Sequence, residues 1–254
     1  MYRCHIAVRP NARDIRSMQI SRPGTLPERS DYDLITEHLS LKHSTLLELG
    51  CGNALTTRQL AEAYPDCEIF ALEVDRTQHE KNLKAGALPN IRFGLGGAQS
   101  TGLNDGSVDA VIMLKSLHHV PVESMDRALT EIARVLRPHG LAYISEPVYA
   151  GDFNRILRRF HDEKIVREAA FAAIRRTVEN GSFTLENEIH FLSESRFVGF
   201  EEFEQRIIGA THSEFSIDDQ LLEEIRSAFM RFVDPDGIAT FKNPMRVDLL
   251  RRPG

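Results

Sequence analysis

The sequence predicts an α/β protein built around a mostly parallel sheet. From residue 45 to residue 146, short apolar runs alternate with amphipathic stretches, which is typical of βαβ units. One apolar run leads directly into a glycine-bearing turn at Leu46–Ala54. The next run ends on an acidic residue, Glu73. Together these observations predict a ligand site where the strands end.

The apolar runs and amphipathic stretches place the individual elements. A helix is expected over Asp31–Leu39, where apolar side chains share one side. The run from Val108 to Met113 is apolar enough for a strand that is buried on both faces. Strands are predicted near residues 45–49, 68–73, 90–95, 107–113 and 140–146, and helices near 56–64, 76–84 and 122–136.

The alternation stops after Glu146. Residues 151–181 predict one or two helices, and residues 147–195 are expected to form a helical insertion that covers the C-terminal edge of the sheet. Residues 1–40 are expected to be an N-terminal arm or lid, and 41–254 one domain. Two later strands are expected, over Phe200–Ile208 and Met245–Arg251. Between them, a capping box at Ser216–Asp219 is expected to begin a helix that ends near Phe232.

The glycine turn indicates what kind of ligand it holds. Gly50 and Gly52 let the backbone turn tightly and approach a ligand closely. A dinucleotide fingerprint needs a third glycine, which would fall at Leu55, so a ligand without a pyrophosphate fits better. Thr56 or Thr57 is expected to cap the helix that follows.

Glu73 is the predicted anchor for a ribose. It lies 23 positions after Gly50, and a carboxylate about 20 residues past such a turn is placed to accept hydrogen bonds from both ribose hydroxyls. Asp75 is the rival carboxylate, but strand alternation favours Glu73 at the strand tip. The alternative is that Glu73 only opens the next helix.

Composition agrees with a compact soluble enzyme. The chain has 254 residues and a net charge of −6 with scattered basic residues, which argues against a nucleic-acid-binding surface. Its three cysteines lack metal spacing, so neither a disulfide framework nor a metal site is expected. No apolar stretch has membrane-spanning length, so no membrane association is expected and a cytoplasmic location is predicted.

Four motifs follow one another in order: Glu48–Gly52, Ala71–Glu73, Ser107–Val111 and Glu131–Gly140. With Leu117–Val120, they make residues 40–147 resemble the class I S-adenosylmethionine-dependent methyltransferases. The nearest likeness is to the small-molecule, ubiquinone/menaquinone-type branch. The resemblance implies a Rossmann-like, doubly wound, mostly parallel seven-stranded sheet with a helical insertion after strand five. It also implies S-adenosyl-L-methionine as cofactor and S-adenosyl-L-homocysteine as product.

The resemblance assigns roles to the matching positions. Glu48 and the glycines would lie beneath the methionine part of the cofactor, Glu73 would hold the ribose, and Val74 would pack on the adenine. Backbone near Lys115 would face the amino-acid end. The expected cofactor-binding residues are Glu48, Gly50, Cys51, Gly52, Glu73, Val74, Ala98, Gln99, Lys115 and Ser116.

Three positions depart from the family pattern. Ala54 stands where a third glycine is common, and His139 replaces a glycine and is strained if its φ is positive. Gly97 replaces an aspartate that binds the adenine amino group, at a cost of about 0.5–1.5 kcal/mol if water or Gln99 substitutes.

Methyl transfer from a sulfonium depends mainly on alignment, and a general base is needed only when the acceptor loses a proton. Candidate bases are His118, His119 and Glu146, whose alternative roles are cofactor packing and ending a strand. His161, His190 and His212 belong to the covering region. The candidate substrate-lining residues are Tyr32, Tyr149 and His212, for which packing, capping or surface roles are the alternatives.

Three functional hypotheses follow. The first is methyl transfer to an O, N or C atom of a small-molecule metabolite, with no nucleic-acid partner. The second is methylation of a macromolecule such as tRNA or protein. The third is a regulatory homologue that binds the cofactor without turnover. The oligomeric state and the acceptor atom are left open by the sequence.

Overall fold

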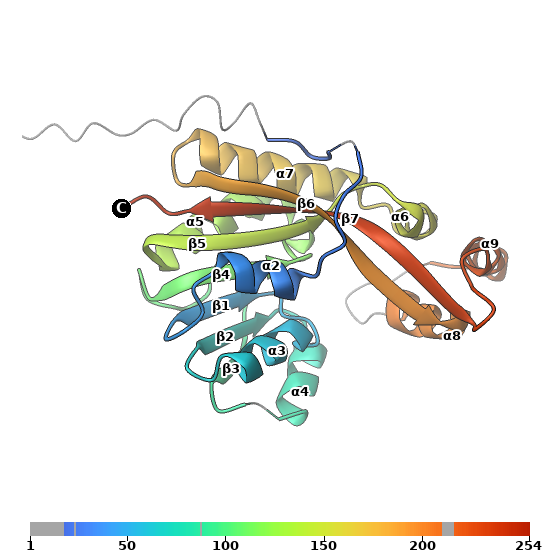
Figure 1. Ribbon diagram of the computed structural model, residues 1–254, viewed down its shortest axis with the longest axis horizontal. Helices are drawn as coiled ribbons and strands as arrows, with labels where there is room; N and C mark the ends of the chain where they lie inside the picture. Colours follow the sequence, from blue (N-terminus) through green and yellow to red (C-terminus); the bar gives the residue numbers. More distant parts are fainter. Residues whose placement is uncertain (1–17, 23, 87, 210–215) are drawn as a thin grey trace, which may run out of the picture.

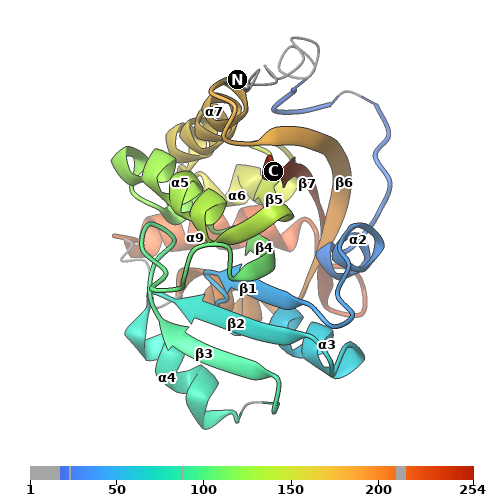
Figure 2. The same cartoon turned by 90° about the vertical axis from the view of Figure 1, so that its left-hand side faces the viewer.

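The computed structural model describes residues 18–22, 24–86, 88–209 and 216–254. Within these residues the chain forms one seven-stranded sheet with the strand order β3-β2-β1-β4-β5-β7-β6 (Figures 1 and 2). The strands are β1 (Thr45–Leu49), β2 (Glu68–Glu73), β3 (Ile91–Leu95), β4 (Val108–Leu114), β5 (Leu136–Pro147), β6 (Thr184–Val198) and β7 (Ile238–Arg251).

The first five strands are parallel, and β7 runs antiparallel to both β5 and β6. This arrangement confirms the predicted fold class, a mostly parallel seven-stranded α/β sheet. The helical elements are α2 (Asp31–His38), α3 (Leu55–Ala63), α4 (Arg76–Lys84), α5 (Met125–Val135), α6 (Asp152–Leu157), α7 (Lys164–Glu179), α8 (Gly199–Phe203) and α9 (Asp219–Met230), with 3-10 turns η1 (Leu117–His119) and η2 (Val122–Ser124) and a π-helical turn η3 (Glu204–Ile208).

Two apolar cores flank the sheet. On one face, Leu34 and Ile35 of α2 and Leu60 of α3 pack with buried strand residues such as Leu46. On the other face, α5 and α7 contribute their apolar sides, and Ile174 of α7 lies in the core that includes β4 and β5. Because both faces are covered, the parallel strands are apolar almost throughout, as expected of a doubly wound sheet.

A third apolar core lies at the far ends of β6 and β7. These two strands pair along their whole length, from Thr184 to Val198 in β6, whereas β5 pairs only with residues 245–251 of β7. The hairpin therefore projects beyond β5, and α8 and α9 lie along it (Figure 1). Its core is rich in phenylalanine, with Phe203 and Phe229 fully buried and their ring centroids 5.0 Å apart.

The predicted insertion at 147–195 is wrong in part. Residues 152–157 and 164–179 are helical as predicted, but β6 begins at Thr184. Helix α7 packs with α5 against a face of the sheet and so forms one of its two helical layers. The projecting hairpin, together with α6, takes the place that was expected for a helical cover.

Three local predictions also fail for identifiable reasons. The predicted strand Phe200–Ile208 is helical, because Phe200, Phe203 and Ile207 repeat at the spacing of a helix face. Helix α9 is capped by Asp218, which accepts from the Leu221 N–H, and does not begin with a capping box at Ser216. Neither Thr56 nor Thr57 caps α3, whose N-cap is Ala54.

The N-terminal part is described from residue 18, apart from residue 23. Here Glu28 pairs with Leu192 on the edge of β6, and α2 then packs into the core. Residues 27–38 therefore belong to the folded body, while residues 1–17 of the predicted arm lie outside the described residues. None of the described helices combines the length and apolar character required to cross a membrane.

Candidate functional site

The glycine turn and Glu73 form one hydrogen-bonded unit where β1 and β2 end. The backbone N–H of Gly52 donates to Glu73 Oε2 at 2.8 Å, and the N–H groups of Val74 and Asp75 donate to Oε1 at 2.8 and 2.9 Å. Asp75 instead caps α4 by accepting from the Thr77 N–H. Both lone pairs of Oε1 are therefore engaged, and Oε2 keeps one lone pair that can accept from a ligand's hydroxyl group.

The turn is tight on one side and open on the other. Gly50 has φ +72°, and a Cβ there would lie 2.7 Å from the Cβ of Ser116. Ser116 follows β4 and donates to the Leu49 carbonyl at 2.8 Å, which joins the ends of β1 and β4. Gly52 also has positive φ, but a Cβ built there would meet nothing within 4 Å.

Three residues beyond the turn have a positive φ although they are not glycine. Ala54 adopts φ 57° and ψ 30° and is fully buried, so its alanine occupies a left-handed position that favours glycine. His139 has φ 67°, as expected for a residue that replaces a glycine, and Lys115 has φ 55°. Left-handed backbone at Ala54 and Lys115 lies next to the predicted cofactor-binding residues and stores strain there.

Glu48 is buried beneath the turn, 2 % exposed, and accepts a hydrogen bond from Thr57 Oγ1 of α3. Burial raises the pKa of its carboxyl group to about 7. Cys51 is also buried, and burial raises the pKa of its thiol, so this sulfur is a packing group. Asn82 of α4 donates to the Gly52 carbonyl at 2.7 Å and holds the turn from the other side.

Beside Glu73, the surface that an adenine-sized ligand would contact is partly apolar and partly polar. Val74 is an apolar side chain that is 66 % exposed, and Ala98 is buried. A Cβ at Gly97 would lie 2.8 Å from the Gln99 side-chain oxygen. The Gln99 amide therefore occupies the space that a side chain at position 97 would take, which supports the predicted substitution for the missing carboxylate.

The predicted catalytic residues meet in a buried cluster after β4 and β5. His118 Nδ1 lies 2.5 Å from Glu146 Oε2, and Glu146 Oε1 accepts from the Leu117 N–H at 2.9 Å. His118 and Glu146 are 4 % and 3 % exposed. The rings of His118 and His119 lie 4.1 Å apart, and His119 is exposed.

The structure adds Glu163, His161 and Arg167 to this cluster, of which only His161 was noted from the sequence. Glu163 Oε1 lies 3.6 Å from His118 Nε2 and 3.0 Å from His161 Nε2. Its other oxygen accepts from Arg167 at 2.5 Å, and Arg167 also donates to Asn154 Oδ1. The sequence offers one signal for the pairing of Glu163 with Arg167, which is their spacing of four residues on a helix. No local pattern in the sequence links either residue to His118.

Charge compensation governs protonation in this cluster. Burial lowers the pKa of His118, but Glu146 and Glu163 outweigh burial and raise it to about 9. Burial likewise raises the pKa of each carboxyl group, and His118 outweighs that effect, so the pKa of Glu146 and that of Glu163 lie below their ordinary values. His118 is therefore a cation at neutral pH and a poor proton acceptor there.

A cavity of about 410 Å³ opens beside the cluster. Lys115, His118 and His119 line its sheet side, and Phe153, Phe197 and Ile207 line it from α6, β6 and η3. Of the predicted substrate residues, Tyr149 hydrogen-bonds Asp162 and Tyr32 packs against the core near α2; neither is among the cavity-lining residues. His212 lies outside the described residues. His190 is buried, and its Nε2 atom lies 3.0 Å from Glu188 Oε1.

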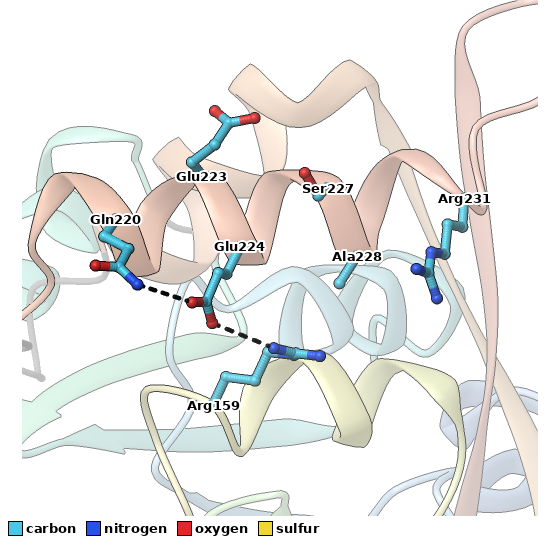
Figure 3. A pocket seen from close by; sticks show the side chains of 7 residues that line it. All are labelled: Arg159, Gln220, Glu223, Glu224, Ser227, Ala228 and Arg231. Carbon is cyan, nitrogen blue, oxygen red and sulfur yellow. Dashed lines mark hydrogen bonds and ion pairs between the residues drawn. The ribbon is translucent and has the colours of Figure 1, made fainter.

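A second hollow, of about 600 Å³, is lined by residues of α9 and by Arg159, and it shares no lining residue with this cavity. Figure 3 shows its side chains: Gln220 and Glu224 contact one another, and Glu224 pairs with Arg159 beside α6. None of its residues belongs to the glycine turn or the histidine cluster. The cavity of about 410 Å³ is thus the one that adjoins the histidine cluster.

Comparison with known proteins agrees with this geometry. Residues 47–144 match the model of the methyltransferase domain family, so this stretch is similar to a methyltransferase domain. The matched span runs from β1 to β5 and includes the glycine turn, Glu73 and His118.

The chain is 34 % identical over 119 residues to an uncharacterized methyltransferase of Mycobacterium tuberculosis, covering 47 % of this chain and 44 % of that one. It is 29 % identical over 132 residues to the phthiotriol/phenolphthiotriol dimycocerosates methyltransferase of Mycobacterium leprae, covering 48 % of each. The chain thus spans about half the length of the curated relatives it matches.

Solved structures share the fold across most of the chain. A candidate methyltransferase of Bacillus halodurans aligns with a TM-score of 0.61 at 15 % identity, over 89 % of this chain and all of that one. The [4+2]-cyclase SpnF aligns with a TM-score of 0.55 at 17 % identity, over 92 % of this chain and 88 % of that one. At these identities the likeness concerns the fold alone.

The contact between Gly50 and Ser116 predicts unequal effects of alanine at the two turn glycines. Gly52→Ala is expected to lower the free energy of unfolding by about 1–2 kcal/mol, the cost of a left-handed backbone. Gly50→Ala is expected to cost about 1–3 kcal/mol more, because its Cβ also overlaps Ser116. Urea unfolding measures both, and Ser116→Gly in the Gly50→Ala background should recover part of the loss. Equal costs at both glycines would contradict the proposed contact.

Burial of Glu48 predicts a pH-dependent loss of stability. Its pKa of about 7 in the folded protein lies above the ordinary 4.5, so its contribution is fully present below pH 4.5 and is lost as the pH rises through 7. The stability of Glu48→Gln relative to the unmodified protein should therefore increase by about 3 kcal/mol from pH 4.5 to pH 8. Urea unfolding across this range tests it, with Glu62→Gln on α3 as the control for removing one exposed carboxylate. A constant difference for Glu48→Gln would refute the assignment.

Proposed function

We propose that this protein transfers the methyl group of S-adenosyl-L-methionine to an O, N or C atom of a small molecule. The observation that carries the proposal is the continuity between two sites. Lys115 lines the 410 Å³ cavity, and its neighbour Ser116 packs directly on Gly50 of the turn. A cofactor on the turn would thus have its methyl group near an enclosed space of metabolite size.

The residues of the turn fit this cofactor. Glu73 Oε2 retains a lone pair for a ribose hydroxyl, the exposed Val74 side chain offers an apolar surface for adenine, and Gln99 offers an amide to the adenine amino group. The space in front of Gly52 lets a ligand approach the backbone. The turn offers no third glycine for a pyrophosphate, in keeping with a nucleoside ligand.

The residues that line the cavity would then position the acceptor molecule. The cofactor supplies the electrophilic methyl group, and the protein supplies alignment and exclusion of water. His118, held as a cation between Glu146 and Glu163, acts as a positioning residue, and so does Glu146. His119 is the exposed member of the pair and lines the cavity, so we assign it to contact the acceptor and to take its proton where one is lost.

Binding without methyl transfer is the second candidate. The [4+2]-cyclase SpnF has the same fold, so the fold by itself does not determine the reaction. Methylation of a macromolecule fits the structure less well, because the cavity is walled by the hairpin, α6 and η3 and carries an apolar side made of Phe153, Phe197 and Ile207.

Cofactor binding tests the turn assignment. Isothermal titration should show that S-adenosyl-L-homocysteine binds, and Glu73→Ala should weaken binding more than tenfold because the ribose contact and the carboxylate that joins the two turns are both lost. Asp75→Ala is the matched control: it removes a neighbouring carboxylate that caps α4, and it should change affinity little. Equal losses in the two variants would reject Glu73 as the ribose anchor.

Transfer of a labelled methyl group tests the substrate class. The purified protein, incubated with methyl-labelled cofactor and separate metabolite, RNA and protein fractions of a bacterial extract, should label the metabolite fraction. The Glu73→Ala variant provides the background. Label in RNA or protein would transfer the assignment to a macromolecular substrate. Tight binding with no label in any fraction would favour the non-catalytic candidate.

A further inference from the structure

The histidine cluster has the composition and spacing of a metal site. One ligand atom each from His118, His119 and Glu163 lie within 4.8 Å of one another, and His118 and Glu163 are buried. His161 Nε2 lies 3.0 Å from Glu163 Oε1 on the same side. Imidazole and carboxylate ligands suit first-row divalent ions such as Zn²⁺, Mn²⁺ and Co²⁺. Sequence reasoning missed this set because it searched for cysteine spacing, whereas Glu163 is distant from His118 in the chain.

The distances suit one shared ion. Ligand atoms lie about 2.0–2.2 Å from such an ion, so two ligands of one ion stand about 3–4 Å apart. His118 Nε2 and Glu163 Oε1 are 3.6 Å apart, and a ligand atom of His119 lies within 4.8 Å of the ligand atoms of both. An ion bound there would displace the Nε2 proton of His118, so its binding would release a proton.

The surrounding contacts orient these ligands as in metal sites. A metal-binding histidine usually donates its other ring N–H to a carboxylate, which fixes the ring and its tautomer. His118 Nδ1 lies 2.5 Å from Glu146 Oε2, which directs Nε2 toward Glu163. Arg167 holds Glu163 Oε2, so Oε1 is the oxygen left facing the imidazoles. Glu146 and Arg167 therefore each contact the ligand atom that is not proposed to face the ion, namely His118 Nδ1 and Glu163 Oε2.

We propose that His118 Nε2, His119 and Glu163 bind a first-row divalent metal ion. The ion would lie in the wall of the 410 Å³ cavity, which gives it an entry path and leaves positions for water or an acceptor oxygen. An ion in this position favours the deprotonated form of a bound hydroxyl group. With the ion bound, His119 would serve as its ligand, and an acceptor hydroxyl group on the ion would release its proton to water instead of to His119. The proposal is independent of cofactor binding at the glycine turn.

Metal titration of the full chain tests the proposal. After treatment with EDTA and gel filtration, calorimetry with ZnCl₂ should show one ion per chain, and CoCl₂ should give a visible absorption band. His119→Ala, an exposed position, should weaken Zn²⁺ binding at least tenfold. Glu146→Gln should weaken it about 10–100-fold, the range for partners of metal ligands. His38→Ala on α2 is the matched control and should bind Zn²⁺ as the unmodified protein does.

The variants are first compared by circular dichroism and urea unfolding, and Glu163→Gln provides a second ligand variant if Glu146→Gln fails to fold. Absence of a one-to-one Zn²⁺ complex would overturn the proposal. Equal affinity in His119→Ala and His38→Ala would overturn it too, because the ion would then bind elsewhere. Titration of the same samples with S-adenosyl-L-homocysteine reports on the proposed function separately, so the two can fail independently.

Discussion

The carboxylate of Glu73 is the contact on which the site depends. Parallel strands β1 and β2 end side by side, and the chain leaves each through a turn whose N–H groups need acceptors. Glu73 accepts from Gly52 in the first turn and from Val74 and Asp75 in the second. One side chain therefore fixes both turns relative to each other and presents the remaining lone pair of Oε2 at the sheet edge. A shorter side chain could not reach the N–H groups of both turns, and a neutral side chain would form weaker hydrogen bonds with them.

A second constraint ties this pair of turns to the acceptor side. Ser116 follows β4 and packs on Gly50, so any shift of the segment after β4 moves the turn after β1. His118 and His119 follow Ser116 directly in η1. The same few residues thus set the distance between a cofactor on the turn and a molecule in the cavity. This explains why glycine is needed at position 50 for packing, and at position 52 for approach.

Sequence reasoning located the elements well where one local signal dominates. The apolar runs predicted β1 and β2 with the bounds that the structure has, because a doubly covered sheet makes each central strand apolar throughout. The turn and Glu73 followed from their spacing alone. Reasoning failed where tertiary packing decides: Phe200–Ile208 is apolar enough for a strand, but its side chains face the core of the hairpin as a helix. It also failed to link Glu163 with His118, since only the packing of α7 against η1 brings them together.

The buried charges beside the cavity are better explained by function than by stability. Desolvation of ions costs several kcal/mol per charge, and a buried ion pair replaced by apolar side chains of equal volume is often neutral or stabilising. His118, Glu146, Glu163 and Arg167 are all at least nine-tenths buried, and the two cations balance the two carboxylates. A core that needed only cohesion would use apolar residues here, as the phenylalanine core of the hairpin does. The cluster instead concentrates polar groups at one wall of an otherwise partly apolar cavity. That is the arrangement expected where a polar atom of a bound molecule must be held in one position.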